Sequence, residues 1–370
     1  MIKLRYTAAS QDASGYAAAA RGYIDALYST GKVDLHCKVV SFEQEKTSHG
    51  ERGQLVQQLA TNNNSARIQI IHLTPDNFHL HKMPGTYNIG YTVWETDKVP
   101  KNWVDECNSL DELWTASEWN VQVFKQSGVT VPVHCVPHVI DPLDLTKAVD
   151  VPIMKSDTFL FYSIHQFLER KHPLALLKAY LTEFSPDENV GLVLKTYRLN
   201  TSAREKELIK RDISHLKSSL RLDQYPPIVF FGDLEPEERM LGIHKRGDCF
   251  ILVPRSEGFG LPIAEAMSIG KPVITGNYSG MTQFAKPDNS FLVNGFETPV
   301  CGMIFKNYSG DMNWYEPDIS QMKKHMRYIF ENQKEAQKVA DKGQQYIAEN
   351  FNKEVIGELM LTHLNRITNA

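Results

Sequence analysis

The stretch FILVPRSEGFGLPIAEA, residues 250–266, combines the end of a strand, a glycine-containing loop and the start of a helix. The apolar run 249–253 that leads into it is typical of a strand buried on both faces of a parallel sheet. Gly258 and Gly260 lack a Cβ atom, so backbone N–H groups there can approach a ligand closely. Pro262 has the φ angle favoured in the first turn of a helix. The stretch therefore predicts a strand, a loop, and a helix that begins near residue 261.

Such a loop places free amides and the positive end of a helix at the carboxyl edge of the sheet, which favours an anionic ligand such as a phosphate. Glu257 precedes the glycines and Glu265 lies early in the predicted helix, so two carboxylates can face the same crevice. Because carboxylates accept hydrogen bonds from hydroxyls, the ligand is expected to combine phosphate with sugar. The alternative is that Glu265 only complements the helix dipole and Glu257 is a solvated loop residue.

The whole chain has 370 residues, a length that favours two domains. A net charge of −4 argues against a nucleic-acid partner bound by bulk electrostatics. The five cysteines lack CxxC spacing and are expected to be reduced core residues of a cytosolic protein. We find no apolar leader and no run of eighteen apolar residues, so we expect a cytoplasmic protein that is neither secreted by that route nor membrane-spanning.

Strands and helices are predicted to alternate in both halves, which is typical of doubly wound α/β domains. We expect an N-terminal Rossmann-like domain at 1–145, a C-terminal one at 146–345, and a terminal helix at 346–370 that packs back on the first domain. The strands are expected at 2–6, 35–41, 68–73, 87–93, 112–115, 133–137, 159–162, 190–196, 228–232, 249–253 and 272–275. The other helices are expected at 16–28, 54–60, 103–109, 118–126, 173–184, 203–219, 235–245, 319–331, 336–350 and 353–369.

The first half contains four candidate site residues. Gly15 follows the first strand and would let its loop approach a phosphate, or it is simply part of a helix start. His72 ends an apolar strand, where a side chain facing a crevice belongs, although a single histidine there is more often structural. Trp94 and Glu95 follow another strand and form either a carbohydrate platform or a packed corner.

Cations follow two strands of the second half. Arg170 and Lys171 come after the first of these strands, and Lys195 lies near the end of the next. Each could be an ordinary surface charge, but together at strand ends they favour pyrophosphate binding. Farther on, the amphipathic helix 319–331 carries Lys323, Lys324 and Arg327, which form either a solvated face or a peripheral membrane contact.

Four segments of the sequence resemble those of a known family. The segment 256–266 with Glu257 and Glu265 resembles the E-x7-E motif of retaining glycosyltransferases of family 4. FGDL at 231–234, GKPVI at 270–274 and VPHVID at 136–141 are similar to other landmarks of that family. The resemblance is strong over most of the second half and loose over the first. It implies a GT-B fold, in which two Rossmann-like domains face each other across a cleft, with the donor in the C-terminal domain and the acceptor in the N-terminal one.

The resemblance also implies roles for residues. Glu257 would contact the donor sugar, Glu265 the ribose hydroxyls, and Lys171 the pyrophosphate. Residues with supporting roles would be Arg170 and Lys195 at the phosphates, Gly258, Phe259 and Gly260 through their amides, Leu234 beside the base, and His72 near the reacting sugar.

The sequence departs from the family in two places. The family has a glycine–arginine pair five or six residues before the lysine, and here Ile164, His165 and Gln166 stand there. Arg170 would take the place of the missing arginine. The family's two-glycine N-terminal loop is reduced to Gly15.

The activity implied is transfer of a sugar, with retention, from a UDP- or GDP-linked donor to a glycan or lipid-linked saccharide. No DxD motif is present, so neither a divalent metal nor a cofactor other than the nucleotide sugar is expected. One alternative is a non-catalytic protein that binds sugar nucleotides or glycans on the same fold, and another is an epimerase or phosphorylase. A dehydrogenase is disfavoured because the glycine loop lacks the third glycine of the dinucleotide fingerprint.

Overall fold

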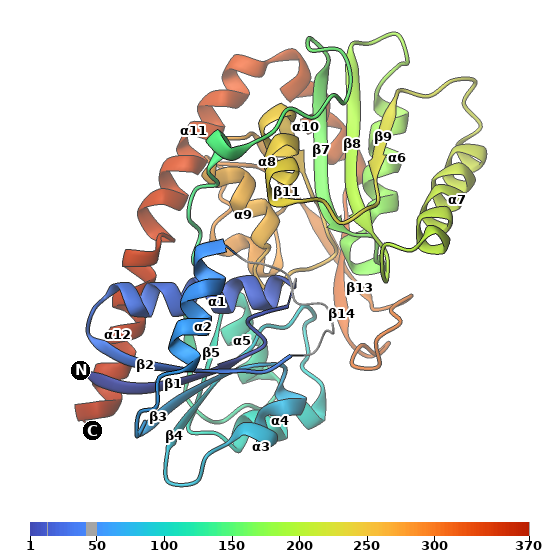
Figure 1. The fold of residues 1–370 in the computed structure, drawn as a ribbon. Coiled ribbons are helices and arrows are strands. Elements are labelled where there is room, and N and C mark those ends of the chain that lie inside the picture. Colours follow the sequence, from blue (N-terminus) through green and yellow to red (C-terminus); the bar gives the residue numbers. More distant parts are fainter. Residues whose placement is uncertain (13, 42–49, 370) are drawn as a thin grey trace. The chain divides into compact units, whose positions relative to one another are not determined.

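The computed structural model describes residues 1–12, 14–41 and 50–369, and it divides into two compact units (Figure 1). Unit 1 comprises Met1–Asp141 and Ala348–Ala370, and unit 2 comprises Pro142–Ile347. None of the helices in the described ranges is long and apolar enough to cross a membrane.

Unit 1 is built on a parallel six-stranded sheet with strand order β2-β1-β3-β4-β5-β6. Its strands are β1 (Ile2–Ala8), β2 (Val33–Val39), β3 (Ile68–His72), β4 (Tyr87–Tyr91), β5 (Glu112–Thr115) and β6 (Val133–Cys135). Its helices are α1 (Gly15–Ser29), α2 (Gly50–Ala60), α3 (Phe78–His81), α4 (Lys101–Asn108), α5 (Glu118–Gln126) and α12 (Lys353–Asn369). The chain returns to this unit at its end, because the Ile140 amide donates to the Phe351 carbonyl at 2.7 Å and α12 packs against α1.

Unit 2 contains a second parallel sheet, with strand order β12-β11-β10-β7-β8-β9. Its strands are β7 (Phe159–Gln166), β8 (Val190–Tyr197), β9 (Ile228–Phe231), β10 (Cys249–Ile251), β11 (Val273–Gly276) and β12 (Phe291–Val293), followed by the antiparallel hairpin β13 (Gly295–Pro299) and β14 (Asn313–Pro317). Its helices are α6 (Pro173–Glu183), α7 (Ala203–Leu220), α8 (Glu237–Arg246), α9 (Leu261–Ser268), α10 (Ile319–Glu331) and α11 (Gln333–Asn350).

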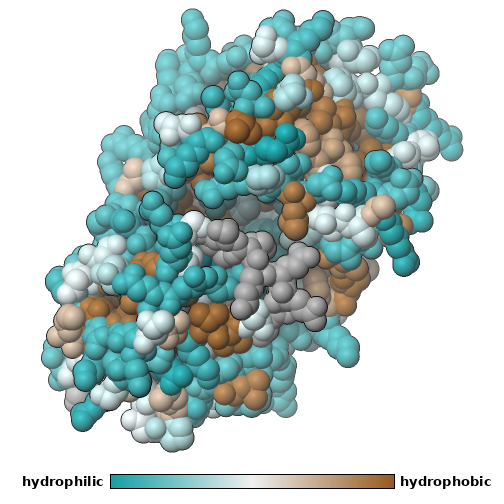
Figure 2. All heavy atoms as spheres, in the orientation of Figure 1, coloured by the Kyte–Doolittle hydropathy of each residue, from teal (hydrophilic) through white to brown (hydrophobic). Residues whose placement is uncertain are grey.

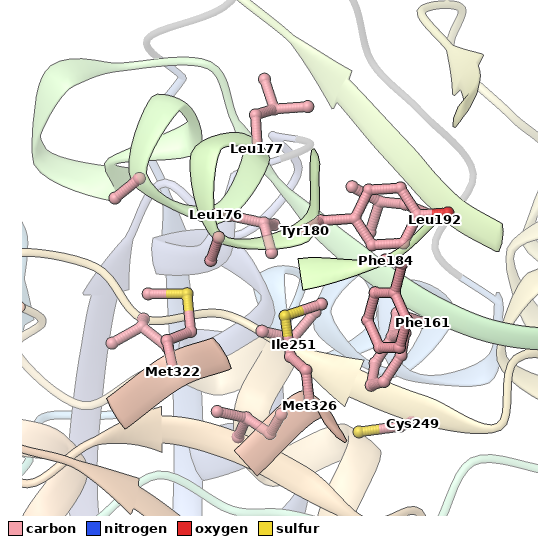
Figure 3. Close-up of a cluster of buried hydrophobic side chains, with 14 of the residues drawn as sticks. Phe161, Leu176, Leu177, Tyr180, Phe184, Leu192, Cys249, Ile251, Met322 and Met326 are labelled. Carbon is pink, nitrogen blue, oxygen red and sulfur yellow. The ribbon is translucent and has the colours of Figure 1, made fainter. Parts of the chain in front are cut away.

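The two faces of this second sheet are covered by different helices. Figure 3 shows Phe161 and Leu192 of the sheet among side chains of α6 and α10. On the opposite face, the Tyr162 hydroxyl lies 3.1 Å from Nδ1 of His244 in α8. Side chains alternate between faces along a strand, so each residue at the carboxyl end of β7 or β8 can be assigned to the α6 face or the α8 face.

The predicted doubly wound α/β architecture is confirmed, and the predicted helices at 319–331 and 353–369 are found with those bounds. The hairpin β13–β14 was not predicted from sequence, because it is short and its residue Phe296 is 65% exposed, so it lacks a buried apolar pattern. Cys301 follows β13 and is exposed, which contradicts its predicted place in the core. Hydrophilic residues predominate on the face that Figure 2 shows.

Candidate functional site

The glycine loop follows β10 at the carboxyl edge of the second sheet. Helix α9 begins at Leu261, as predicted, with Pro262 in its first turn. Gly260 caps this helix with φ of 104°, in the left-handed region where a side chain would be strained. This backbone conformation explains why the sequence has glycine at position 260.

Glu257 is buried at the start of this loop, and two hydrogen bonds attach its backbone to the turn after β11. Its amide donates to Ser279 Oγ at 3.2 Å, and the Gly280 amide donates to its carbonyl at 2.9 Å. A Cβ atom on Gly280 would lie 2.1 Å from the Gly258 carbonyl oxygen, so the two loops touch through their backbones. Sequence reasoning missed this support, although the Ser279-Gly280 pair just after an apolar strand was a signal for it.

The Glu257 carboxylate forms ion pairs with the two cations that follow β7. Arg170 Nη1 lies 3.0 Å from one carboxylate oxygen, and Lys171 Nζ contacts the other. Burial raises the pKa of Glu257, but the charges of Lys171 and Arg170 outweigh burial and lower the pKa overall. Two cations and one carboxylate leave a local net positive charge, which favours binding of an anion.

Arg255, which sequence reasoning did not single out, fixes this cluster in place. Its guanidinium binds Glu316 at 2.8 and 3.0 Å and the Glu169 carbonyl at 2.8 Å, and it lies 5.2 Å from the centre of the Trp314 ring. Its amide donates to the Arg170 carbonyl at 2.7 Å. The unpredicted strand β14, which carries Trp314 and Glu316, is thus part of the support for the two cations.

Lys195 does not join the cluster of Glu257, Arg170 and Lys171. Leu192 and Leu194 point to the α6 face, so Lys195 points to the α8 face. Burial lowers the pKa of Lys195, and the carboxylates of Glu235 and Asp233 offset part of this effect. The structure therefore brings together two of the three predicted cations and places the third on the other face of the sheet.

Glu265 and Leu234 were predicted to contact the nucleoside. Glu265 is partly buried in α9, and burial raises its pKa to about 6. Within the part of the chain that the structure describes, no cation forms an ion pair with this carboxylate. Leu234 is 59% exposed in the connection between β9 and α8. A carboxylate without an ion-pair partner and an exposed connecting residue are both compatible with a nearby ligand.

His72, at the end of β3 in unit 1, is enclosed by tyrosines. Its Nδ1 lies 2.9 Å from the Tyr6 hydroxyl, and the ring centres of Tyr16 and Tyr91 lie at 5.1 and 4.4 Å. Burial lowers its pKa well below the usual value, and the neighbouring His138 lowers it further. The imidazole is therefore neutral at pH 7 and only 1% exposed.

Trp94 is not an exposed platform, so of the two alternatives for it the packed corner is correct. Its indole N–H lies 2.6 Å from both Thr96 Oγ1 and the Lys98 carbonyl, and its ring packs edge-on against Trp103 at 4.7 Å. A buried indole N–H needs a hydrogen-bond acceptor, and these two oxygens provide it, so the Trp94 side chain can be buried. Glu95 beside it is partly buried.

Gly15 is the first residue of α1, and the Ser14 hydroxyl caps this helix by accepting from the Ala17 amide at 3.2 Å. The local geometry of Gly15 is therefore that of an ordinary helix start. In α10, Lys323 donates to the Thr182 carbonyl at 3.0 Å and Arg327 binds Glu183 at 2.9 Å. These two cations attach α10 to α6, so they do not form the free basic face that a membrane contact would need.

Comparison with known proteins gives one matching family model. Residues 217–346 match the model described as glycosyl transferases group 1. A curated relative, an uncharacterized protein of Sulfolobus islandicus rod-shaped virus 1, is 23% identical over 216 residues. That match spans 57% of this chain and 58% of the relative.

Solved structures resemble the whole chain. HepE from Anabaena, solved with UDP and glucose, matches with a TM-score of 0.68 and 14% identity, covering 99% of this chain and 100% of that one. Sucrose-phosphate synthase from Thermosynechococcus elongatus matches with a TM-score of 0.69 and 13% identity, covering 100% of both chains. Two parallel six-stranded sheets in this order, together with these similarities, establish that the chain has the GT-B fold.

Proposed function

We propose that the protein is a glycosyltransferase that moves a sugar from a nucleoside diphosphate sugar to a carbohydrate acceptor. The observation that carries the proposal is the buried cluster of Glu257 with Arg170 and Lys171 beside the glycine loop. It combines cations for a diphosphate with a carboxylate for hydroxyls. The match of residues 217–346 to glycosyl transferases group 1 supports the proposal, as does the fold shared with a protein solved with UDP and glucose.

The proposed reaction retains the configuration at the anomeric carbon. The bond from that carbon to the diphosphate oxygen breaks, a bond to the acceptor oxygen forms on the same face, and the acceptor proton moves to the departing diphosphate. Arg170 and Lys171 would stabilise the charge that grows on the leaving group, a contribution that is often the largest in such sites. Glu257 would orient the sugar, and Glu265 would accept hydrogen bonds from the ribose.

The donor is proposed to be UDP- or GDP-linked and the acceptor a glycan or a lipid-linked saccharide. The reaction is proposed to need neither a metal ion nor a further cofactor, which the lack of a DxD motif supports. A cytoplasmic setting is supported by five cysteines that are all free thiols.

The test measures release of nucleoside diphosphate from a panel of UDP- and GDP-linked hexoses, with and without oligosaccharide acceptors. We expect turnover by the wild type and a loss of about 100-fold or more in Lys171→Ala, since a cation on the leaving group contributes several kcal/mol. Lys178→Ala is the matched control, because Lys178 is an exposed lysine of α6. NMR of the product reports the anomeric configuration.

The same assay separates the proposal from a binding protein. Each nucleoside diphosphate is also tested for thermal stabilisation of the chain, which a ligand at 100 times its Kd increases by about 2.7 kcal/mol. Stabilisation by a nucleotide without turnover of any donor would favour the non-catalytic alternative. Consumption of the donor with no need for an acceptor would point to an epimerase or phosphorylase.

A further inference from the structure

Three buried polar atoms at the carboxyl edge of the second sheet have no hydrogen-bond partner among the described residues. They are His165 Nε2, Thr196 Oγ1 and Ser256 Oγ. The first two are the next-to-last residues of β7 and β8, and the third follows β10; these three strands are neighbours in the order β10-β7-β8. Buried polar groups are nearly always paired, because an unpaired one is unfavourable. Three such atoms at one edge are therefore candidates for contact with a ligand.

The register of the strands brings two of these side chains together. His165 of β7 pairs with Thr196 of β8, and paired residues of neighbouring strands point to the same face of the sheet. Their face continues that of Phe161 and Leu192, which α6 covers, as Figure 3 shows. They consequently lie beneath the turn that carries Arg170 and Lys171 and leads into the N-terminus of α6.

Ser256 and the charged groups lie close to His165 and Thr196. The Ser256 carbonyl accepts a hydrogen bond from Arg170 at 2.9 Å, so its residue is attached to the cation. Burial lowers the pKa of His165 to about 3, and the charges of Lys171 and Glu257 both act on it. The ring is therefore neutral at pH 7.

The Ser163 hydroxyl is compatible with a tautomer in which Nε2 of His165 is the donor. Nδ1 lies 2.9 Å from the Ser163 hydroxyl. With Ser163 donating to Nδ1, the single proton of the neutral ring lies on Nε2, the unpaired atom. All three orphan atoms can then donate a hydrogen bond, and donors beside two cations suit a charged oxygen better than a sugar hydroxyl.

We propose that His165, Thr196 and Ser256 form a neutral donor site for the phosphate oxygens of the diphosphate, next to Arg170 and Lys171. His165 is then a positioning residue at the place where the sequence lacks an arginine. The inference rests on the proposed function for the identity of the ligand. The site supplies directional hydrogen bonds, whereas the cations supply charge, so the two contributions can be separated by experiment.

The test measures the Kd of the full chain for inorganic pyrophosphate by calorimetry, together with thermal unfolding. Thr196→Val and Ser256→Ala should each weaken pyrophosphate binding by about 10-fold, while the stability of the chain stays the same or rises, because an unpaired buried hydroxyl is removed. Thr158→Val is the matched control. Thr158 lies before β7 at the opposite edge of the sheet and is already bonded to Asn189, so this variant should bind pyrophosphate like the wild type.

Two further variants test His165. His165→Gln retains an N–H donor near the position of Nε2 and should bind pyrophosphate within about threefold of the wild type. His165→Phe retains the ring without a donor and should lose about 10-fold. Glucose replaces pyrophosphate in a parallel titration, and a stronger effect of the variants on glucose would overturn the assignment to phosphate.

The outcomes separate this inference from the proposed function. Pyrophosphate binding that depends on the three residues, in a chain that transfers no sugar, supports the donor site and refutes the glycosyltransferase. Sugar transfer with unchanged pyrophosphate binding in all the variants refutes the donor site alone. A wild type that does not bind pyrophosphate also overturns it.

Discussion

The Glu257 carboxylate and a bound diphosphate would compete for the same two cations. The carboxylate forms ion pairs with Arg170 and Lys171, and the same two cations are the groups that would bind a diphosphate. A diphosphate must therefore share these cations with Glu257 or replace it on them. The carboxylate acts as an internal anion that keeps two buried cations compatible with folding, since a buried charge without a partner is strongly destabilising.

The first prediction concerns Glu257→Gln. We expect the free energy of unfolding to fall by about 3 kcal/mol, because two largely buried cations lose the carboxylate of Glu257 from among their contacts. Pyrophosphate should stabilise the variant more than it stabilises the wild type, while sugar transfer should be lost. Thermal unfolding with and without pyrophosphate measures both effects, and Glu237→Gln, at an exposed site in α8, is the control. Near-normal turnover by the Glu257 variant would contradict the role given to this residue.

The second prediction is a pH dependence at Glu265. Its pKa rises from 4.5 to about 6 in the folded chain because of burial. The folded state therefore binds this proton more tightly than the unfolded state. The stability that this group contributes is complete below pH 4.5 and is lost as the pH rises through about 6. At pH 8 the wild type should therefore be less stable than Glu265→Gln by about 2 kcal/mol.

Urea unfolding of the two proteins between pH 4.5 and pH 8 checks this expectation, and the difference between them cancels the titration of other groups. The same variant should bind nucleoside diphosphates more weakly, because an amide accepts fewer hydrogen bonds from ribose hydroxyls. An unchanged nucleotide affinity would count against the ribose role. A difference in stability that does not vary with pH would count against the buried carboxyl.

At the scale of elements, the third prediction concerns the contact between the glycine loop and the turn after β11. In Gly280→Ala the new Cβ would lie 2.1 Å from the Gly258 carbonyl oxygen, so the backbone of one loop must move. We expect pyrophosphate binding to weaken by about 10-fold or more, since the shift moves the amides of the glycine loop that are proposed to contact the phosphates. Gly310→Ala is the control, because its Cβ would meet only the Val300 carbonyl at 3.9 Å. Equal affinity in both variants would show that the loop contact does not position the site.

Most of the elements could be predicted because their signals are local. An unbroken apolar run bounded by Pro254 defined a strand, and Pro262 defined a helix start at residue 261. The hairpin β13–β14 escaped prediction because its first strand is largely exposed and its pairing links residues as distant as Gly295 and Pro317. Arg255 escaped for the same reason, since its partners Glu169 and Glu316 are brought to it only by the tertiary fold.

At the scale of the molecule, the candidate site could be predicted as a set of residue types but not as a set of contacts. The sequence indicated which side chains end strands, and the structure shows that Glu257 and Lys171, 86 residues apart, are in direct contact. The face to which Lys195 points depends on the register of β8, which a list of strand ends does not contain. Whether a buried atom such as His165 Nε2 has a hydrogen-bond partner likewise depends on the tertiary structure around it.

The last prediction concerns the return of the chain to unit 1. Helix α12 buries Ile356, Met360, Leu361 and Leu364, and Arg366 binds the buried Glu112 of β5. Burial of four such side chains contributes on the order of 8 kcal/mol, which is comparable to the whole stability of a domain. A chain that ends at residue 350 should therefore lose the folded unit 1, while unit 2, which contains the cluster around Glu257, stays folded.

Limited proteolysis with mass spectrometry tests this expectation on the shortened chain, with pyrophosphate binding as the readout for unit 2. Cleavage should spread through the strands of unit 1, whereas residues 142–347 should remain protected. Leu361→Ala in the full chain is the milder variant and should lower the free energy of unfolding of unit 1 by roughly 2–5 kcal/mol. Continued protection of the strands of unit 1 without α12 would mean that this sheet folds on its own. The ion pair between Arg366 and Glu112 would then not be needed for folding. Groups within the first 141 residues would already offset the free-energy cost of burying the Glu112 carboxylate.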